Sequence, residues 1–266
     1  MAGQNASVRA IAVDWSGRTA NPGPAIWLAE ARAGQIRRLE GGRDRAELTD
    51  HLLSEAERDP ELVVGLDFAF SFPAWFVEQH ATTAFEFWDV VRSHGEQWLG
   101  ECLTPFWRTR GVEPLPEERA YRRTERDLRV GAIRPTSVFK LVGASQVGAG
   151  SIRGMPFLAG LREAGFRVWP FEDAATPFLV EIWPRLLTRA LVKSRRTDRL
   201  QYLAGRIPEL TDPLRSVAAS GDDMFDAAVS AAVMWRHLEQ LLHLRREVEY
   251  ELEGRIWAPG SVGTSH

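Results

Sequence analysis

Residues 8–17 read VRAIAVDWSG, and this stretch decides the fold. Residues 8–14 are short, apolar and partly β-branched, which is typical of a strand buried in a sheet. The strand ends at Asp14, and the turn Trp15-Ser16-Gly17 follows at once. We therefore expect a buried first strand that carries a carboxylate at its carboxyl end.

The residues that follow extend this strand into a mixed sheet. Residues 25–31 (AIWLAEA) and 35–39 predict two more strands, and their short connections favour an antiparallel meander. Residues 43–59 have helical spacing, and residues 61–67 (ELVVGLD) predict a second buried strand, which ends in Asp67. A helix between two strands usually sets them parallel, so this fourth strand is expected beside the first.

The rest of the chain adds an insertion and completes the sheet. Residues 70–165 contain several proline breaks and predict a largely helical insertion that covers the sheet. Residues 178–183 (FLVEIW) predict a further strand, residues 221–250 the longest helix, and residues 253–258 a last edge strand. We expect a single α/β domain over residues 1–266, with antiparallel strands 1–3, parallel strands 1, 4 and 5, flanking helices, and the insertion at about 70–165.

Composition excludes several classes of protein. The formal net charge is -3, so the chain as a whole is not a basic nucleic-acid binder, and such contact would need a local basic patch. No apolar run is long enough for a membrane span, and the first residues lack a signal-peptide pattern. Cys102 is the single cysteine, so no internal disulfide forms. These features predict a cytoplasmic protein and leave the oligomeric state open.

Asp14 and Asp67 are the first candidate site residues, because each ends a buried strand. If the two strands are parallel neighbours, their carboxyl ends lie on one side of the sheet, with backbones about 5 Å apart. Two carboxylates so placed repel each other unless a proton or a metal ion lies between them. Hard oxygen ligands of this kind suit Mg²⁺ or Mn²⁺.

Further acids stand at later element ends. Glu181 lies near the end of the predicted strand at 178–183, either paired in a buried site or facing water from an edge strand. Asp223 and Asp226 are spaced to share one face of the late helix, beside a run of small residues. Asp222 is expected only to cap that helix. The histidines show no metal-ligand spacing, and no G-x-S-x-G or Walker A pattern occurs.

The set VDWSG, GLDFAFSFP, VEIWP and GDDMFDAAVSA resembles the family of predicted RNase H-like nucleases, over residues 8–67 and about 178–258. The resemblance implies a ribonuclease H-like fold and a metal-dependent nuclease acting on DNA or RNA. It implies that Asp14, Asp67 and Asp226 hold two Mg²⁺ or Mn²⁺ ions, with Asp223 as the extra helix acid. Glu181 matches only the narrower family. Hydrolysis would use one ion to activate water and the other to stabilise the leaving oxygen.

Basic residues could supply a surface for a phosphate backbone. The insertion is rich in arginine, and Arg123, Arg134 and Lys140 are the candidate substrate-binding residues. A second basic group lies within residues 193–199. The alternative for both groups is a solvated helix face with paired charges.

Two other functions fit the same pattern. An actin-like or sugar-kinase-like phosphotransferase shares the strand order, but it normally needs a second subdomain and a second phosphate loop. A non-catalytic binding protein could also keep the fold. Substrate type, endo- or exonucleolytic cleavage and activity itself stay open at this level.

Overall fold

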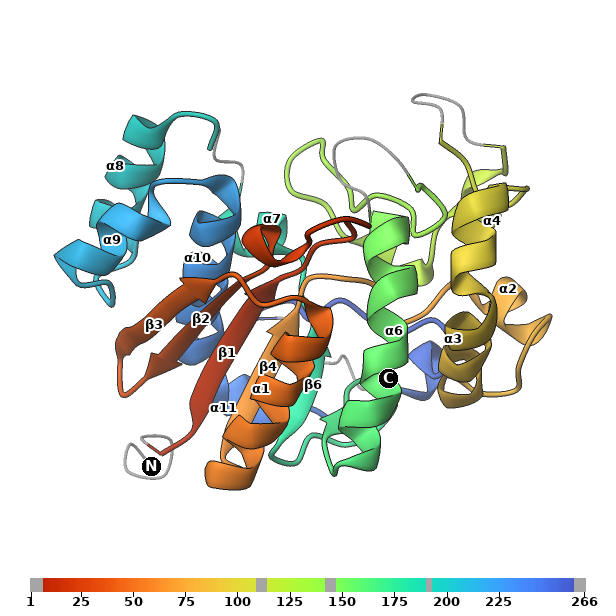
Figure 1. The fold of residues 1–266 in the computed structure, drawn as a ribbon, viewed down its shortest axis with the longest axis horizontal. Helices are drawn as coiled ribbons and strands as arrows, with labels where there is room; N and C mark the ends of the chain where they lie inside the picture. Colours follow the sequence, from red (N-terminus) through yellow and green to blue (C-terminus); the bar gives the residue numbers. More distant parts are fainter. Residues whose placement is uncertain (1–6, 109–113, 142–146, 190–192, 261–266) are drawn as a thin grey trace.

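A six-stranded sheet runs through the centre of the computed structural model, which describes residues 7–108, 114–141, 147–189 and 193–260 (Figure 1). The strand order across the sheet is β3-β2-β1-β4-β6-β5. The strands are β1 (Arg9–Asp14), β2 (Trp27–Arg32), β3 (Gln35–Gly41), β4 (Leu62–Leu66), β5 (Arg167–Val168) and β6 (Phe178–Glu181).

Helices occupy most of the remaining described chain. Before and within the insertion they are η1 (Gly23–Ala25), α1 (Arg45–Arg58), α2 (Ala74–Glu78), α3 (Ala84–Glu101), α4 (Glu117–Ala120), α5 (Arg123–Asp127) and α6 (Val147–Glu163). After it they are α7 (Pro184–Thr188), α8 (Arg196–Arg206), α9 (Asp212–Ala218), α10 (Asp222–Arg236), α11 (Leu238–Leu242) and η2 (Val248–Tyr250).

The pairing of the strands confirms the predicted mixed sheet. β2 pairs antiparallel with both β1 and β3, whereas β4 pairs parallel with β1 and with β6. The short strand β5 adds a further parallel edge beside β6. Because Val13 is paired with Leu66, Asp14 at the end of β1 and Asp67 directly after β4 lie at the same level of the sheet.

Alternation along the strands separates two hydrophobic layers. Ile11 and Val13 of β1 face α1 and the insertion, whereas Ala10 and Ala12 face the layer that contains α10. Figure 1 shows α1 and α6 in front of the sheet and α10 behind it. The small side chains on the second face allow α10 to lie close to the strands, with which it makes extensive contacts.

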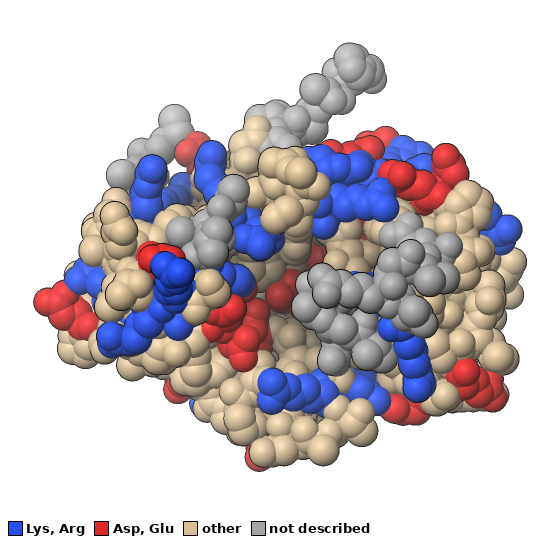
Figure 2. Space-filling view, turned by 90° about the horizontal axis from the view of Figure 1, so that it is seen from above, with Lys and Arg blue, Asp and Glu red and all other residues tan. Residues whose placement is uncertain are grey.

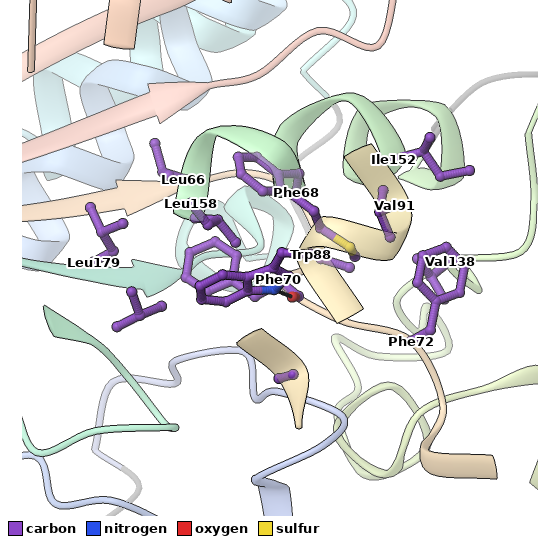
Figure 3. Close-up of a cluster of buried hydrophobic side chains, with 14 of the residues drawn as sticks. Leu66, Phe68, Phe70, Phe72, Trp88, Val91, Val138, Ile152, Leu158 and Leu179 are labelled. Atoms are coloured by element: carbon purple, nitrogen blue, oxygen red, sulfur yellow. Dashed lines mark hydrogen bonds between the residues drawn. The ribbon is translucent and has the colours of Figure 1, made fainter. Parts of the chain in front are cut away.

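The insertion and the sheet share one hydrophobic cluster. Leu66 and Leu179 from the sheet pack in the same cluster as Phe70, Trp88 and Leu158 (Figure 3). The long helices α3 and α6 pack against each other, and α6 also contacts α1. The largely helical insertion therefore covers the front face of the sheet, as the sequence predicted.

Two predicted elements differ in the structure. The helical pattern of residues 221–250 is broken at His237, after which the short helix α11 buries Leu238 and Leu241. The edge strand predicted at residues 253–258 is wrong. There the chain forms a single bridge between Glu181 and Ile256, and Trp257 donates its backbone N–H to Glu181 O at 2.8 Å.

Across the described parts of the chain, no helix combines the length and the apolar character that crossing a bilayer requires.

Candidate active site

Asp14 and Asp67 meet at the carboxyl ends of β1 and β4. The backbone N–H of Asp67 donates to Val13 O at 3.1 Å, which continues the parallel ladder by one residue beyond β4. The charge of Asp67 raises the pKa of Asp14, so the two carboxyl groups interact electrostatically. Two neighbouring carboxylates repel each other unless a proton or a cation lies between them.

The pKa values of both carboxyl groups are raised well above their ordinary range. Burial is the first cause for each, although both side chains keep some exposure into a cavity. The charge of Asp67 is the next cause for Asp14, and the charge of Asp226 is the next cause for Asp67. At this end of the sheet, burial and the charges of neighbouring acids thus both disfavour the ionisation of Asp14 and Asp67.

Helix α10 supplies the remaining acids from behind the sheet. Asp226 is 8% exposed, and burial raises its pKa, whereas the adjacent Lys193 ammonium lowers it. Its Oδ2 atom accepts a hydrogen bond from Lys193 Nζ, while its buried Oδ1 atom has no hydrogen-bond partner among the described residues. Asp223, one turn earlier, is half-buried, and burial raises its pKa as well.

Asp222 has a different role from the predicted cap. The residue that caps α10 is Gly221, which makes no side-chain cap bond. Asp222 is the first residue of the helix and accepts a hydrogen bond from Arg199 Nη1 at 2.8 Å.

These acids line one cavity of about 620 Å³. Figure 2 looks down on the carboxyl ends of the strands, where acidic atoms lie deep in a hollow and basic side chains surround it. The lining includes the acids Asp14, Asp67, Asp223 and Asp226, and the basic residues Arg18, Arg134, Arg185 and Lys193. The site therefore has an acidic floor and a basic rim.

The loop that follows β1 forms one wall of this cavity and is held from outside by two arginines. Arg45 of α1 donates from Nη1 to Ser16 O at 2.8 Å and to Arg18 O at 3.0 Å. Arg153 of α6 donates to Gly17 O, the carbonyl between them, at 2.5 Å. Three consecutive carbonyl groups are thus fixed to the helices that cover the sheet.

Glu181 lies at the end of β6, but its carboxylate is paired with Arg122. It is 2% exposed and belongs to β6, a strand that lies between β4 and β5, so the alternative of a solvent-facing edge strand is wrong. Arg122 donates to both of its oxygens, at 2.8 and 2.5 Å, and the Phe70 N–H donates to Oε2 at 3.0 Å. Glu181 therefore anchors the insertion to the sheet in this arrangement, and its catalytic role stays a prediction.

The three predicted substrate-binding residues have separate locations. Arg134 lines the cavity, lies 3.8 Å from the Tyr121 ring centroid and pairs with Glu117 at 2.8 Å. Arg123 is the first residue of α5, pairs with Glu249 at 2.9 Å and does not line the cavity. Lys140 is also absent from the described lining. The structure thus brings one of the three to the acids.

The donor set fits a divalent cation, although the present arrangement is not a closed coordination shell. Within the described ranges, no three His, Cys, Asp or Glu side chains are grouped so that they could hold a metal ion. The carboxylates of Asp14, Asp67 and Asp226 nevertheless share one cavity, and the Asp226 Oδ1 atom is buried and unpartnered. Hard oxygen donors of this kind match Mg²⁺ or Mn²⁺.

Lys193 is the site residue that sequence reasoning placed only in a general basic group. One available signal was composition, because the chain has only two lysines, Lys140 and Lys193, among 33 lysines and arginines. Its position opposite Asp226 depends on a contact between residues 33 apart in sequence, which no local pattern contains.

No protein-family model, no curated protein and no solved structure matches this chain in the comparisons with known proteins.

Proposed function

We propose that the protein is a divalent-metal-dependent nuclease that hydrolyses phosphodiester bonds of DNA or RNA on a ribonuclease H-like fold. The observation that carries the proposal is the meeting of Asp14, Asp67 and Asp226 in one cavity, where burial and the charges of neighbouring acids raise the pKa of each. Perturbed carboxyl groups in a concave site are the expected mark of a functional centre.

The topology supports the same proposal. The order β3-β2-β1-β4-β6, with an antiparallel β1–β3 meander and parallel β1, β4 and β6, agrees with the ribonuclease H-like arrangement that the motifs imply. Asp14 ends β1, Asp67 follows β4, and Asp223 and Asp226 lie in the first two turns of α10, which are the positions that the resemblance assigns to metal ligands. Ligand sites of open α/β sheets form at the carboxyl ends of strands.

The residues of the cavity divide into two chemical roles. Asp14, Asp67 and Asp226 would hold the divalent ions, with Asp223 as an outer ligand nearer the entrance. Bound ions would lower the pKa of an attacking water and stabilise the leaving oxygen. Arg18, Arg134 and Arg185 on the rim would contact phosphate groups and orient the backbone. The acidic floor of the cavity repels the phosphate groups of a substrate. The positive charges of the rim arginines would offset this repulsion as the substrate enters.

The test is metal-dependent cleavage by the purified protein. With Mn²⁺ or Mg²⁺, we expect cleavage of at least one substrate among single-stranded, duplex, hybrid and branched DNA or RNA. Asp14→Asn should reduce that cleavage roughly a hundredfold or more, because it removes a charge that the reaction needs in a buried site. The matched control is Asp89→Asn, which changes an exposed aspartate on α3 and should cleave as the parent does.

Two results would contradict the proposal. One is the absence of cleavage of every substrate with either ion. The other is a cleavage that Asp14→Asn leaves unchanged, which would place the reaction elsewhere. Tight ATP binding by calorimetry without cleavage would favour the phosphotransferase alternative instead.

A further inference from the structure

Lys193 places one positive charge among the acids of the cavity. Its Nζ atom is bonded to Asp226 Oδ2, and its side chain is 21% exposed. The charge of this ammonium lowers the pKa of all four site acids, Asp14, Asp67, Asp223 and Asp226. Lys193 therefore partly offsets the repulsion that burial and crowding create.

The backbone carbonyl of Lys193 is held by Arg199, whereas its side chain keeps partial exposure in the cavity. Arg199 is 6% exposed and donates from Nη1 to Lys193 O at 2.6 Å and to Asp222 Oδ1 at 2.8 Å. Its Nε donates to Ala219 O at 2.9 Å, just before α10. Arg199 thus links the backbone of Lys193 to the start of α10. The ammonium group is joined to this fixed backbone by the flexible four-carbon side chain.

A lysine ammonium can move away from a carboxylate partner more readily than an arginine guanidinium can. Arginine forms planar bidentate pairs, as Arg122 does with Glu181, and such pairs are held in one geometry. Lysine is a compact point charge on a flexible stem. At Asp226 it uses one carboxylate oxygen and leaves Oδ1 buried and without a partner in the described chain.

We propose that Lys193 is an exchangeable counter-cation, which partly offsets the negative charge of the acid cluster in the metal-free protein and is displaced when a divalent ion binds at Asp226. This inference rests on the proposed function, because it concerns the same metal site. The ammonium and the ion compete for one carboxylate, and their like charges repel each other when both are close. Lys193 thus weakens ion binding and prevents the empty site from carrying several unpaired buried charges.

The experiment compares Lys193→Met with the parent chain, with Lys140→Met as the matched control. Mn²⁺ binding is measured by calorimetry on the full chain after chelation, and Tm is measured with and without Mn²⁺. Lys193→Met should bind Mn²⁺ about tenfold more tightly or better, since a competing charge in a buried site is gone. Its metal-free Tm should fall by a few degrees, and saturating Mn²⁺ should restore it.

Lys193→Arg and Lys140→Met give the reference values. Lys193→Arg keeps the charge and could pair with both oxygens of Asp226, so it should bind Mn²⁺ no more tightly than the parent. Lys140→Met removes a lysine that does not line the cavity and should change neither Mn²⁺ affinity nor the Tm difference between metal-free and loaded protein.

The outcomes separate the two proposals. Equal or weaker Mn²⁺ binding by Lys193→Met overturns the exchange, while measurable Mn²⁺ binding by the parent leaves the proposed function in place. If neither protein binds Mn²⁺, the metal site and the exchange both fail, even where Lys193→Met is less stable without metal. Tighter binding together with a lower metal-free Tm supports the exchange.

Discussion

At the scale of single residues, Glu125 and Glu181 share the guanidinium of Arg122 inside the protein. All three are almost fully buried, and Arg122 donates from Nε to Glu125 at 2.9 Å. One cation cannot fully compensate two buried carboxylates. Burial accordingly raises the pKa of Glu125 from 4.5 to about 7, although Arg122 acts in the opposite direction.

This pKa predicts how stability changes with pH. Because the folded state holds the Glu125 proton up to about pH 7 and the unfolded state releases it near 4.5, folding is favoured at low pH in this window. The contribution is complete below pH 4.5 and is lost as the pH rises through about 7. The loss amounts to at most about 3 kcal/mol.

Glu125→Gln should remove that dependence, because glutamine resembles the protonated acid. The difference in free energy of unfolding between parent and variant, measured by urea denaturation from pH 5 to 8, should shift in favour of the variant as the pH rises. A difference that stays constant over this range would show that Glu125 is charged in the folded protein throughout.

At the scale of elements, the loop after β1 depends on a close backbone contact with α6. A Cβ atom on Gly17 would lie 2.5 Å from Gly150 N and 2.8 Å from Ala149 C. Backbone atoms cannot move aside as a flexible side chain can. Gly17 therefore allows the loop to lie against the helix whose Arg153 binds its carbonyl group.

Gly17→Ala should separate the loop from α6 and destabilise the protein by about 1–3 kcal/mol. It should also reduce any activity of the cavity, because the loop carries part of the cavity wall. The control is Gly100→Ala on α3, where a Cβ meets no atom within 4 Å. That change should be neutral or stabilising by up to about 1 kcal/mol. Equal free energies of unfolding for the two variants in urea would contradict the contact.

At the scale of the whole molecule, the position of α10 decides whether the acids meet. The helix lies against the sheet through buried alanines, and Gly65 of β4 leaves room for it. A Cβ on Gly65 would lie 2.6 Å from Met234 Sδ and 2.8 Å from Ile182 Cγ2. Asp226 is on this helix, so its distance from Asp14 and Asp67 depends on how closely the helix packs.

Ala231→Leu should therefore affect stability and metal binding together. Ala231 is fully buried, and the added volume should cost about 1–3 kcal/mol in free energy of unfolding by moving α10 away from the strands. Mn²⁺ affinity measured by calorimetry below the Tm should fall as well. Loss of stability with unchanged Mn²⁺ affinity would show that the geometry of the acid cluster does not depend on how closely α10 packs against the strands.

Local patterns were sufficient for much of the fold and for part of the candidate site. The alternation and turns of residues 8–67 predicted β1 to β4, and a helical crossover predicted that β1 and β4 are parallel. Placing Asp14 beside Asp67 followed from that pairing alone. The break at His237 and the single bridge at Ile256 were missed, and the bridge is a backbone contact with Glu181, which is distant in sequence.

The sequence by itself determined the sheet and the positions of its acids, because strand period, turn residues and crossover geometry act over short distances. Only the tertiary structure decided the partners of those acids. Glu181 is paired with Arg122 across 59 residues, and Asp226 with Lys193 across 33 residues. Such pairs form wherever burial makes an uncompensated charge costly, and burial is a property of the assembled molecule.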